Sequence, residues 1–351
     1  RDIALNGFFT EKTWDGSINV VDRNIKMDVL GMFNFENKLP EFDFTLNIAK
    51  AKLYYLNFEK TDTSSSVTLL LTSNFKGNNI DNIDGEIRLL NSNFVRYGNN
   101  LELYNFSVKT FISDNKPVLR LRTDFVNADL TGYYNFGEFR NLARYTLSRL
   151  MPSKFPSSIK LKDIRKNNFS FKINFKNTDE INAFLSTGLL IAENSFIEGN
   201  IFPDSILKVY GNSRKLTLFN NIFNDFSISS SIKGNELALN LKSSSLDMLR
   251  QSKLDSFIIN LNTKPDNFLF SVNWGKKEDV INNGSFIARG TFLKENPKLK
   301  NSLLKIEIDS TDINSRNNLW RISSSSIIID SNAVRINRFL IGSKEYFYLV
   351  D

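Results

Sequence analysis

The side chains that could carry chemistry in this sequence are mostly carboxylates, lysines, arginines and hydroxyls. The 351 residues include no Cys and no His. Their absence excludes thiol nucleophiles, disulfides, Ser-His-Asp triads, imidazole bases and the usual zinc sites. The patterns still open are acidic pairs, calcium loops and phosphate-binding loops.

None of these patterns is complete. The stretch from Ile80 to Asn91 has Asn, Asp and Gly at EF-hand-like offsets, but its first and last positions lack the carboxylates that calcium requires. Asp84 and Glu86 lie two residues apart on one face, yet glycoside hydrolysis also needs a facing cleft. No GxGxxG or Walker sequence occurs. The sequence therefore predicts a protein that is not an enzyme and has no metal and no cofactor.

The basic residues do not form a nucleic-acid motif. The net charge of +7 comes from 45 basic and 38 acidic residues spread along the chain. The densest basic cluster, Lys160, Lys162, Arg165 and Lys166, has no interleaved aromatic residues. We interpret it as a solvated segment and expect no nucleic-acid partner. A basic surface could still attract phosphate-bearing lipid headgroups at short range.

The elements that would position any site are short strands. Between Val67 and Ile112, runs of alternating apolar and polar residues are separated by clusters of Asn, Asp and Gly. This alternation has the period of a pleated strand, and the clusters are typical of turns. The sequence predicts a mostly β fold built from antiparallel strands.

The clearest alternating runs place apolar side chains on one face of each strand. These are the residues that we expect to form a binding surface: Phe42, Phe44, Leu46 and Ile48; Val67, Leu69 and Leu71; Phe169, Phe171, Ile173 and Phe175; Leu237, Leu239 and Leu241; and Phe257, Ile259 and Leu261.

At Asn135 the apolar period changes from two to about 3.6, which predicts an amphipathic helix from Asn135 to Leu150. Asn135 and Glu138 have capping-box spacing, and Pro152 and Pro156 end the helix. We favour a helix that caps the end of a sheet or covers an edge, although its arginines leave a membrane-surface or gating role open.

A shorter helix is expected from Asp179 to Thr187, with Thr178 as N-cap and Gly188 after its end. The helix at Asn135 suggests three parts: a first groove segment at residues 1–134, the helix and its proline stop at 135–156, and a second segment at 157–351 that continues the same sheet.

More than twenty short strands fit this pattern, too many for one sandwich of the usual size. Successive sandwiches could bury the apolar faces against each other. Alternatively, one long sheet could curl into a trough whose apolar lining holds acyl chains, since a soluble monomer rarely exposes so much apolar surface. Alternation alone leaves both arrangements open.

Four stretches have a recognisable pattern: Asp15-Gly16 through Asp22-Arg23-Asn24 into Met27 to Phe35; Asn74-Phe75-Lys76-Gly77 with Ile83-Asp84-Gly85-Glu86-Ile87; Phe184-Leu185 through Ile197-Glu198-Gly199; and Trp320-Arg321-Ile322 through Ile336-Asn337-Arg338-Phe339. These stretches resemble proteins of the TamB-type translocation and assembly module family, within the wider AsmA-like group.

This resemblance implies an elongated antiparallel sheet curled into a β-taco, or repeating β-groove, with an apolar interior. It implies a periplasmic body with an inner-membrane anchor, reaching toward the outer membrane, and a barrel partner of the Omp85 type. Because Arg1 is not a starting Met, we expect a segment of a longer chain whose anchor lies outside it.

The sequence and the resemblance together predict a conduit that shields phospholipid acyl chains between the inner and outer membranes and supports outer-membrane biogenesis. The alternative is a cell-envelope array of β-sandwiches that acts as an adhesin or a protein-assembly scaffold and binds partners by β-augmentation.

Overall fold

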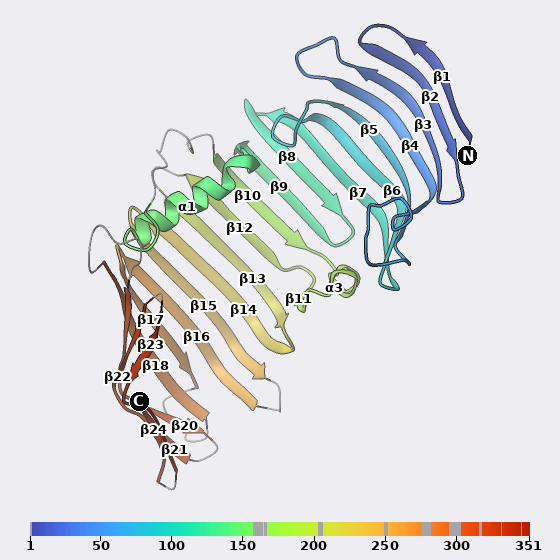
Figure 1. The fold of residues 1–351 in the computed structure, drawn as a ribbon. Helices are drawn as coiled ribbons and strands as arrows, with labels where there is room; N and C mark the ends of the chain where they lie inside the picture. Colours follow the sequence, from blue (N-terminus) through green and yellow to red (C-terminus); the bar gives the residue numbers. More distant parts are fainter. Residues whose placement is uncertain are drawn as a thin grey trace. The chain divides into compact units, whose positions relative to one another are not determined.

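The computed structural model describes residues 2–156, 164, 167–202, 206–248, 252–275, 282–294, 303–315, 318–330, 332–344 and 346–351. Within these ranges, 25 strands belong to one open sheet, accompanied by short helices (Figure 1). The mostly β, antiparallel fold predicted from the alternating runs is confirmed. The chain divides into two compact units, Arg1–Phe136 with Phe171–Asn194 and Gly137–Ser170 with Ser195–Asp351. We call them the N-terminal and C-terminal units and describe each by itself.

The N-terminal unit is an antiparallel meander in which β1 to β9 each pair with the next strand. The strands are β1 (Asp2–Phe9), β2 (Thr13–Val21), β3 (Ile25–Asn34), β4 (Glu41–Lys52), β5 (Ser66–Lys76), β6 (Asp84–Arg96), β7 (Asn99–Ser113), β8 (Lys116–Thr123) and β9 (Val126–Tyr133). Asn, Asp and Gly fill several of its turns, for example Asp114 and Asn115, which both have positive φ.

Glycines bring neighbouring strands of this unit close together. Gly7, Gly16 and Gly31 face one another across β1, β2 and β3. A Cβ atom on Gly31, where φ is +150°, would lie 2.2 Å from the carbonyl oxygen of Asp43 on β4. Only glycine permits this approach, which is typical of places where a sheet bends sharply.

The remainder of the N-terminal unit contains most of β10 (Asn168–Phe175), the helix α3 (Asp179–Leu185) and β11 (Leu189–Ile191). The predicted second helix is confirmed, but it ends earlier, because Ser186 adopts the left-handed conformation (φ 52°). Thr178 occupies the N-cap position without capping the helix. Its hydroxyl instead donates to the carbonyl oxygen of Ile191, at 3.0 Å.

In the C-terminal unit, strands β12 to β18 continue the antiparallel order. They are β12 (Phe196–Phe202), β13 (Ile206–Leu218), β14 (Asn221–Lys233), β15 (Glu236–Met248), β16 (Ser252–Lys264), β17 (Asn267–Trp274) and β18 (Asn282–Leu293). Aromatic rings lie over glycines of the next strand, since a Cβ on Gly290 would lie 2.0 Å from Cζ of Phe268.

The sheet forks at β18, which pairs with both β19 (Leu303–Ile308) and β20 (Thr311–Ser315). One branch continues through β22 (Ser325–Ile329) and β23 (Val334–Asn337), and the other through β21 (Asn318–Ile322), β24 (Phe339–Gly342) and β25 (Phe347–Val350). Side chains from the two branches meet in a closed core around Ala288, Ile308 and Ile322, each no more than 6% exposed. This end of the C-terminal unit is therefore filled.

The amphipathic helix predicted at Asn135 to Leu150 is confirmed as a 3₁₀ turn (Phe136–Glu138) followed by α1 (Phe139–Leu150). The predicted capping box does not cap α1. The α-helical part begins one turn later than expected, with Glu138 at the N-cap and no side-chain hydrogen bond from it to the helix backbone. The Glu138 carboxylate instead accepts a hydrogen bond from the side-chain amide of Asn141 at 2.6 Å, three residues further along the first turn.

Helix α1 borders the hairpin ends of the C-terminal unit (Figure 1). The Arg149 guanidinium donates to Oδ1 of Asn235 (2.9 Å) in the turn between β14 and β15. After the helix, the Ser153 amide and hydroxyl donate to the Asp266 carboxylate (2.8 and 2.9 Å) in the turn between β16 and β17. These contacts hold the helix and the segment after it along the strand ends of this unit.

Candidate functional site

The register of the N-terminal unit gathers apolar side chains on one face of the sheet. Each residue of one cross-strand row pairs directly with the next: Leu5, Ile18, Val29, Leu46, Leu71, Leu89 and Phe106. Because side chains at directly paired positions lie on the same face, the row forms a continuous apolar strip across seven strands.

A second row on this face is aromatic. Phe9, Trp14, Phe33, Phe42 and Phe75 pair in succession on β1 to β5. Ring centroids lie 5.2 Å apart for Trp14 and Phe33, 6.0 Å for Phe33 and Phe42, and 4.9 Å for Phe42 and Phe75. These separations are those of favourable aromatic pairs, so the rings stabilise the sheet while presenting a broad apolar surface.

The C-terminal unit has the same organisation. One row consists of Val209, Ser230, Leu239, Leu261, Phe270, Ala288 and Ile308. The row beside it on the same face consists of Gly211, Ile228, Leu241, Ile259, Val272 and Phe286. Apart from Gly211 and Ser230, these rows are apolar from β13 to β18.

The apolar faces are open along most of each unit. Of the residues predicted to form the binding surface, only Val67, Phe169 and Phe257 are buried, and the others are half-buried. In a closed sandwich the same side chains would be excluded from water by the opposite sheet. Among the described residues, closure of this kind is found at the forked end around Ala288, Ile308 and Ile322.

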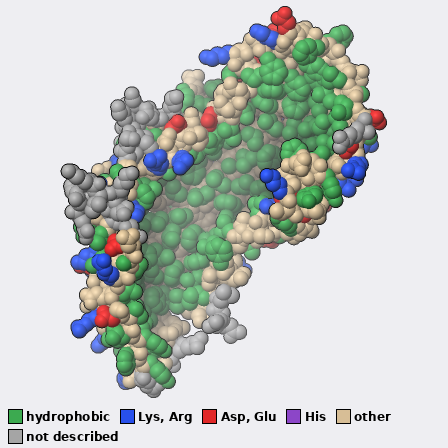
Figure 2. Space-filling model, in the orientation of Figure 1, with side chains coloured by type: hydrophobic (Ala, Val, Ile, Leu, Met, Phe, Trp, Pro, Cys, Tyr) green, Lys and Arg blue, Asp and Glu red, His purple; other side chains and the backbone are tan. Residues whose placement is uncertain are grey.

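Figure 2 shows where these faces are hollowed. Hydrophobic side chains, in green, cover the concave face of β1 to β9, and hydrophobic side chains also cover the concave face of the C-terminal unit. Lysine and arginine side chains lie mainly at the rims. Each unit therefore has an apolar trough whose rim is polar.

The predicted residues are brought together within each unit. Leu46 pairs with Leu71, and Ile48 pairs with Leu69. In the C-terminal unit, Leu239 pairs with Leu261 and Leu241 with Ile259. Each of these pairs is formed by residues predicted from alternation alone.

The four predicted residues on β10 have a less uniform environment. Phe169, Phe171, Ile173 and Phe175 alternate along the strand and so share one face. Phe169 is 3% exposed and stacks on Phe139 of α1, with centroids 5.8 Å apart. It therefore anchors the helix rather than lining an open surface.

The sequence reasoning missed much of the aromatic lining. Trp14, Phe33 and Phe75 belong to the aromatic row but were not among the predicted residues, and neither were Phe270 and Phe286 of the C-terminal unit. Period-two spacing places Phe270 on one face with Phe268 and Val272, but the spacing alone did not assign it to the binding surface. The row itself depends on register, which no single strand reveals.

The opposite face of the N-terminal unit is polar and charge-paired. Its central row consists of Asp43, Asn74, Glu86, Lys109, Arg120 and Asp129. Arg120 and Arg122 both bind the Asp129 carboxylate, at 2.9 and 2.8 Å. Burial opposes ionisation of Asp129, but the hydrogen bonds and charges of the two arginines outweigh it and lower its pKa. This face is thus a solvated surface of mutually satisfied ions.

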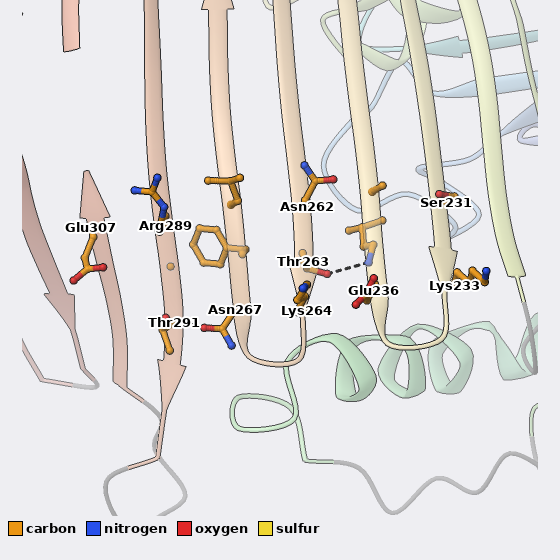
Figure 3. Close-up of a pocket in the computed structure, with 15 residues that line it drawn as sticks. Ser231, Lys233, Glu236, Asn262, Thr263, Lys264, Asn267, Arg289, Thr291 and Glu307 are labelled. Carbon is orange, nitrogen blue, oxygen red and sulfur yellow. Dashed lines mark hydrogen bonds between the residues drawn. The ribbon is translucent and has the colours of Figure 1, made fainter. Parts of the chain in front are cut away.

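A hollow of about 610 Å³ lies over the polar face of the C-terminal unit (Figure 3). Its central row is Ser231, Ala238, Asn262, Leu269, Arg289 and Glu307, which is offset by one residue from the apolar row. Lysine, arginine and glutamate side chains alternate around it, and Glu307 is paired with Lys305 at 2.7 Å. The charges do not converge on one point, so the hollow defines no ligand.

Among the described residues, no group of three or more Asp and Glu side chains could hold a metal ion. In the same part of the chain, no helix has both the length and the apolarity to cross a membrane. No protein-family model matches the chain, and searches of curated proteins and of solved structures found no match either. Functional inference therefore rests on the two faces of the sheet.

Proposed function

We propose that the apolar troughs bind the acyl chains of phospholipids while the polar headgroups remain in water at the rim. The observation that carries this proposal is the openness of the apolar rows, in which residues such as Phe44 and Leu239 are only half-buried. Exposed apolar surface of this extent is unfavourable in water unless a ligand covers it.

The lining suits acyl chains because it offers little directional chemistry. Rows of Leu, Ile, Val and Phe supply contact area, and each methylene of a bound chain contributes roughly 0.8 kcal/mol when it leaves water. Gly31 and Ser73 lie in the same row as Phe44 and introduce no charge. Such a surface selects for hydrocarbon and not for a particular headgroup.

In this proposal the chain is not an enzyme. It acts as part of a periplasmic conduit for phospholipids between the inner and outer membranes, with an inner-membrane anchor outside the segment and an outer-membrane barrel of the Omp85 type as partner. These cellular assignments come from the resemblance to the TamB-type family, and the open troughs support the lipid-binding part of them.

A second candidate function is supported by the edge strand β1. All eight residues of β1 are exposed, including Ile3 (74%) and Phe8 (86%), and in the described structure β1 pairs only with β2. A strand that is paired on one side can accept a further strand on the other, and in this second candidate function another protein supplies that strand by β-augmentation. This would suit an adhesin or assembly scaffold.

Native mass spectrometry of the purified chain, followed by lipid extraction, separates the two functions. Phospholipid binding predicts protein-bound masses of phospholipids, and Leu239→Asp, which places a charge in the trough of the C-terminal unit, should reduce the amount of bound lipid. The matched control is Ala238→Asp, on the opposite face one residue away, which should retain the lipid. A folded, lipid-free parent protein would rule out the trough proposal and favour the scaffold.

A further inference from the structure

A loop from Leu53 to Ser65 joins β4 to β5 at one end of the strands of the N-terminal unit (Figure 1). Its first part is a helical turn in which the Phe58 amide donates to the Leu53 carbonyl oxygen at 2.9 Å. Asn57 ends the turn in the left-handed conformation (φ 62°), and the Leu53 amide closes the loop by donating to Ser65 O at 2.9 Å. The loop is thus ordered by its own hydrogen bonds.

The loop is joined to the neighbouring hairpin between β6 and β7. The Asp62 carboxylate accepts a hydrogen bond from the backbone N–H of Tyr97 at 2.6 Å. The hydroxyls of Thr61 and Tyr97 lie 2.9 Å apart. Loop and hairpin therefore form one surface with fixed relative positions.

This surface exposes three large aromatic side chains. Phe58 is 80% exposed, Tyr97 59% and Tyr55 53%. An apolar ring held this far out of a well-ordered loop gains nothing from the fold itself. Tyr and other aromatic residues with one apolar and one polar end are enriched where proteins meet the headgroup layer of a membrane.

Cations accompany the rings. Lys52 Nζ lies 5.5 Å from the centre of the Tyr55 ring, and the Arg96 guanidinium lies 5.3 Å from that of Tyr97. Lys60 and Arg96 are exposed, and neither forms an ion pair within the part of the chain that the structure describes. The Arg96 charge also acts on the Asp62 carboxylate, and both cations remain exposed to an external anion.

The two carboxylates of the loop accept hydrogen bonds from the loop itself and from the neighbouring hairpin. Glu59 accepts hydrogen bonds from the amides of Lys60 and Thr61 at 2.8 and 2.9 Å. Asp62 accepts from the Ser64 amide and hydroxyl in addition to Tyr97. The acids thus hold the loop in shape, while Lys60 and Arg96 are exposed to solvent and Lys52 is half-buried beside the Tyr55 ring.

We propose that Lys52, Tyr55, Phe58, Lys60, Arg96 and Tyr97, here called the aromatic-basic rim, bind the headgroup layer of a bilayer that contains anionic phospholipid. The rings insert at the boundary between headgroups and acyl chains, and the cations bind lipid phosphates. This goes beyond acyl-chain binding, since it identifies a membrane-docking surface at one end of the strands that line the N-terminal trough. It does not require the trough to hold lipid.

Vesicle flotation of the whole chain tests this proposal. The vesicles contain phosphatidylethanolamine and phosphatidylglycerol in one series and phosphatidylcholine alone in the other. The double variant Tyr55→Ser, Phe58→Ser should lose about tenfold in partition onto the anionic vesicles, as expected when two inserting rings are removed. Phe219→Ser, at the exposed tip between β13 and β14 (68%), is the matched control and should float like the parent.

A second double variant tests how much the basic side chains contribute to vesicle binding. Lys60→Gln with Arg96→Gln should weaken flotation on anionic vesicles several-fold, leave the weaker binding to phosphatidylcholine unchanged, and reduce the sensitivity to salt. Circular dichroism verifies that each variant is folded.

Flotation that both rim variants leave unchanged, or that Phe219→Ser weakens equally, would overturn the proposal and point to binding elsewhere, including the troughs. The two proposals fail separately. Rim variants that keep copurified lipid and lose flotation support the rim, whereas a parent without copurified lipid that still floats through the rim contradicts only the trough function.

Discussion

At the scale of single residues, the consequence of a substitution depends on what covers the side chain. Leu239 and Ile308 belong to the same cross-strand row of the C-terminal unit. Leu239 is half-buried on the open part of the face, whereas Ile308 is 6% exposed in the closed core at the fork. The row therefore provides a direct comparison between an open and a filled apolar surface.

We expect Leu239→Asp to lower the free energy of unfolding by about 1 kcal/mol, because its carboxylate can remain hydrated in the trough. Ile308→Asp should cost about 3 to 5 kcal/mol, since an unpaired charge would be buried in a dry core. Urea denaturation measures both. Equal, large losses would mean that the trough is filled under native conditions.

Alternation predicted which side chain points to which face, and it did so correctly for Leu46, Leu71, Leu239 and Leu261, because a strand has a fixed period of two. It could not predict the aromatic row from Trp14 to Phe75. Pairing depends on register, and register depends on turns and bulges in several strands at once. The close approach at Gly31 was hidden for the same reason, since its partner atom belongs to another strand.

At the scale of elements, hydrogen bonds of polar side chains help to determine helix boundaries and loop conformations, which the alternating apolar pattern does not predict. The N-terminal boundary of α1 was misjudged because Asn135 and Glu138 match a capping box by spacing, while the helix begins only at Phe139. The spacing of Leu53 and Tyr55 favours a strand from Lys52 to Phe58, which is wrong, since the stretch from Leu53 to Ser65 is a loop. Its order comes from Glu59 and Asp62 binding backbone amides, and such contacts leave no period in the sequence.

The loop should loosen in acid. The backbone N–H of Thr61, with the Thr61 hydroxyl and the N–H of Lys60, lowers the pKa of Glu59 from 4.5 to about 2. A lowered folded-state pKa means that the ionised Glu59 stabilises the loop fully above pH 4.5 and loses that contribution as the pH falls toward 2. The hydroxyl of Ser64 and the N–H of Tyr97 lower the pKa of Asp62 and act in the same direction.

Pepsin cleavage within residues 53–65 should therefore accelerate between pH 4.5 and pH 2.5, relative to cleavage elsewhere in the chain. The variant Glu59→Gln, which has no charge to lose, should be cleaved readily at pH 4.5 and should change less with pH. An identical pH profile for parent and variant would show that Glu59 does not hold the loop.

At the scale of the whole molecule, the sequence predicted a mostly β chain with more than twenty strands but could not choose between sandwiches and an open sheet. The two arrangements share the same alternation, because a face that packs on another sheet and a face that lines a trough are equally apolar. The choice depends on long-range contacts. Among the described residues, apolar side chains of the two branches pack into a closed core at the fork of the C-terminal unit, around Ile308 and Ile322.

Unfolding should not be a single transition, because the chain has two compact units. Trp14 reports on the N-terminal unit, while Trp274 and Trp320 report on the C-terminal unit. Variants that retain either Trp14 alone or Trp274 alone should give different urea midpoints by fluorescence. Coincident midpoints, with the same dependence on urea, would indicate that the two units unfold cooperatively as one.

From β1 to β9, and again from β12 to β18, each strand pairs with the next strand in the sequence. A barrel or sandwich must close, and closure fixes the number of strands it can contain. A sheet in which each strand pairs only with its neighbours has no fixed number of strands, as is also true of the repeats in solenoid proteins. Duplication or loss of a hairpin would therefore alter the reach of such a protein without requiring a new fold, and length becomes a property that selection can adjust in steps of two strands.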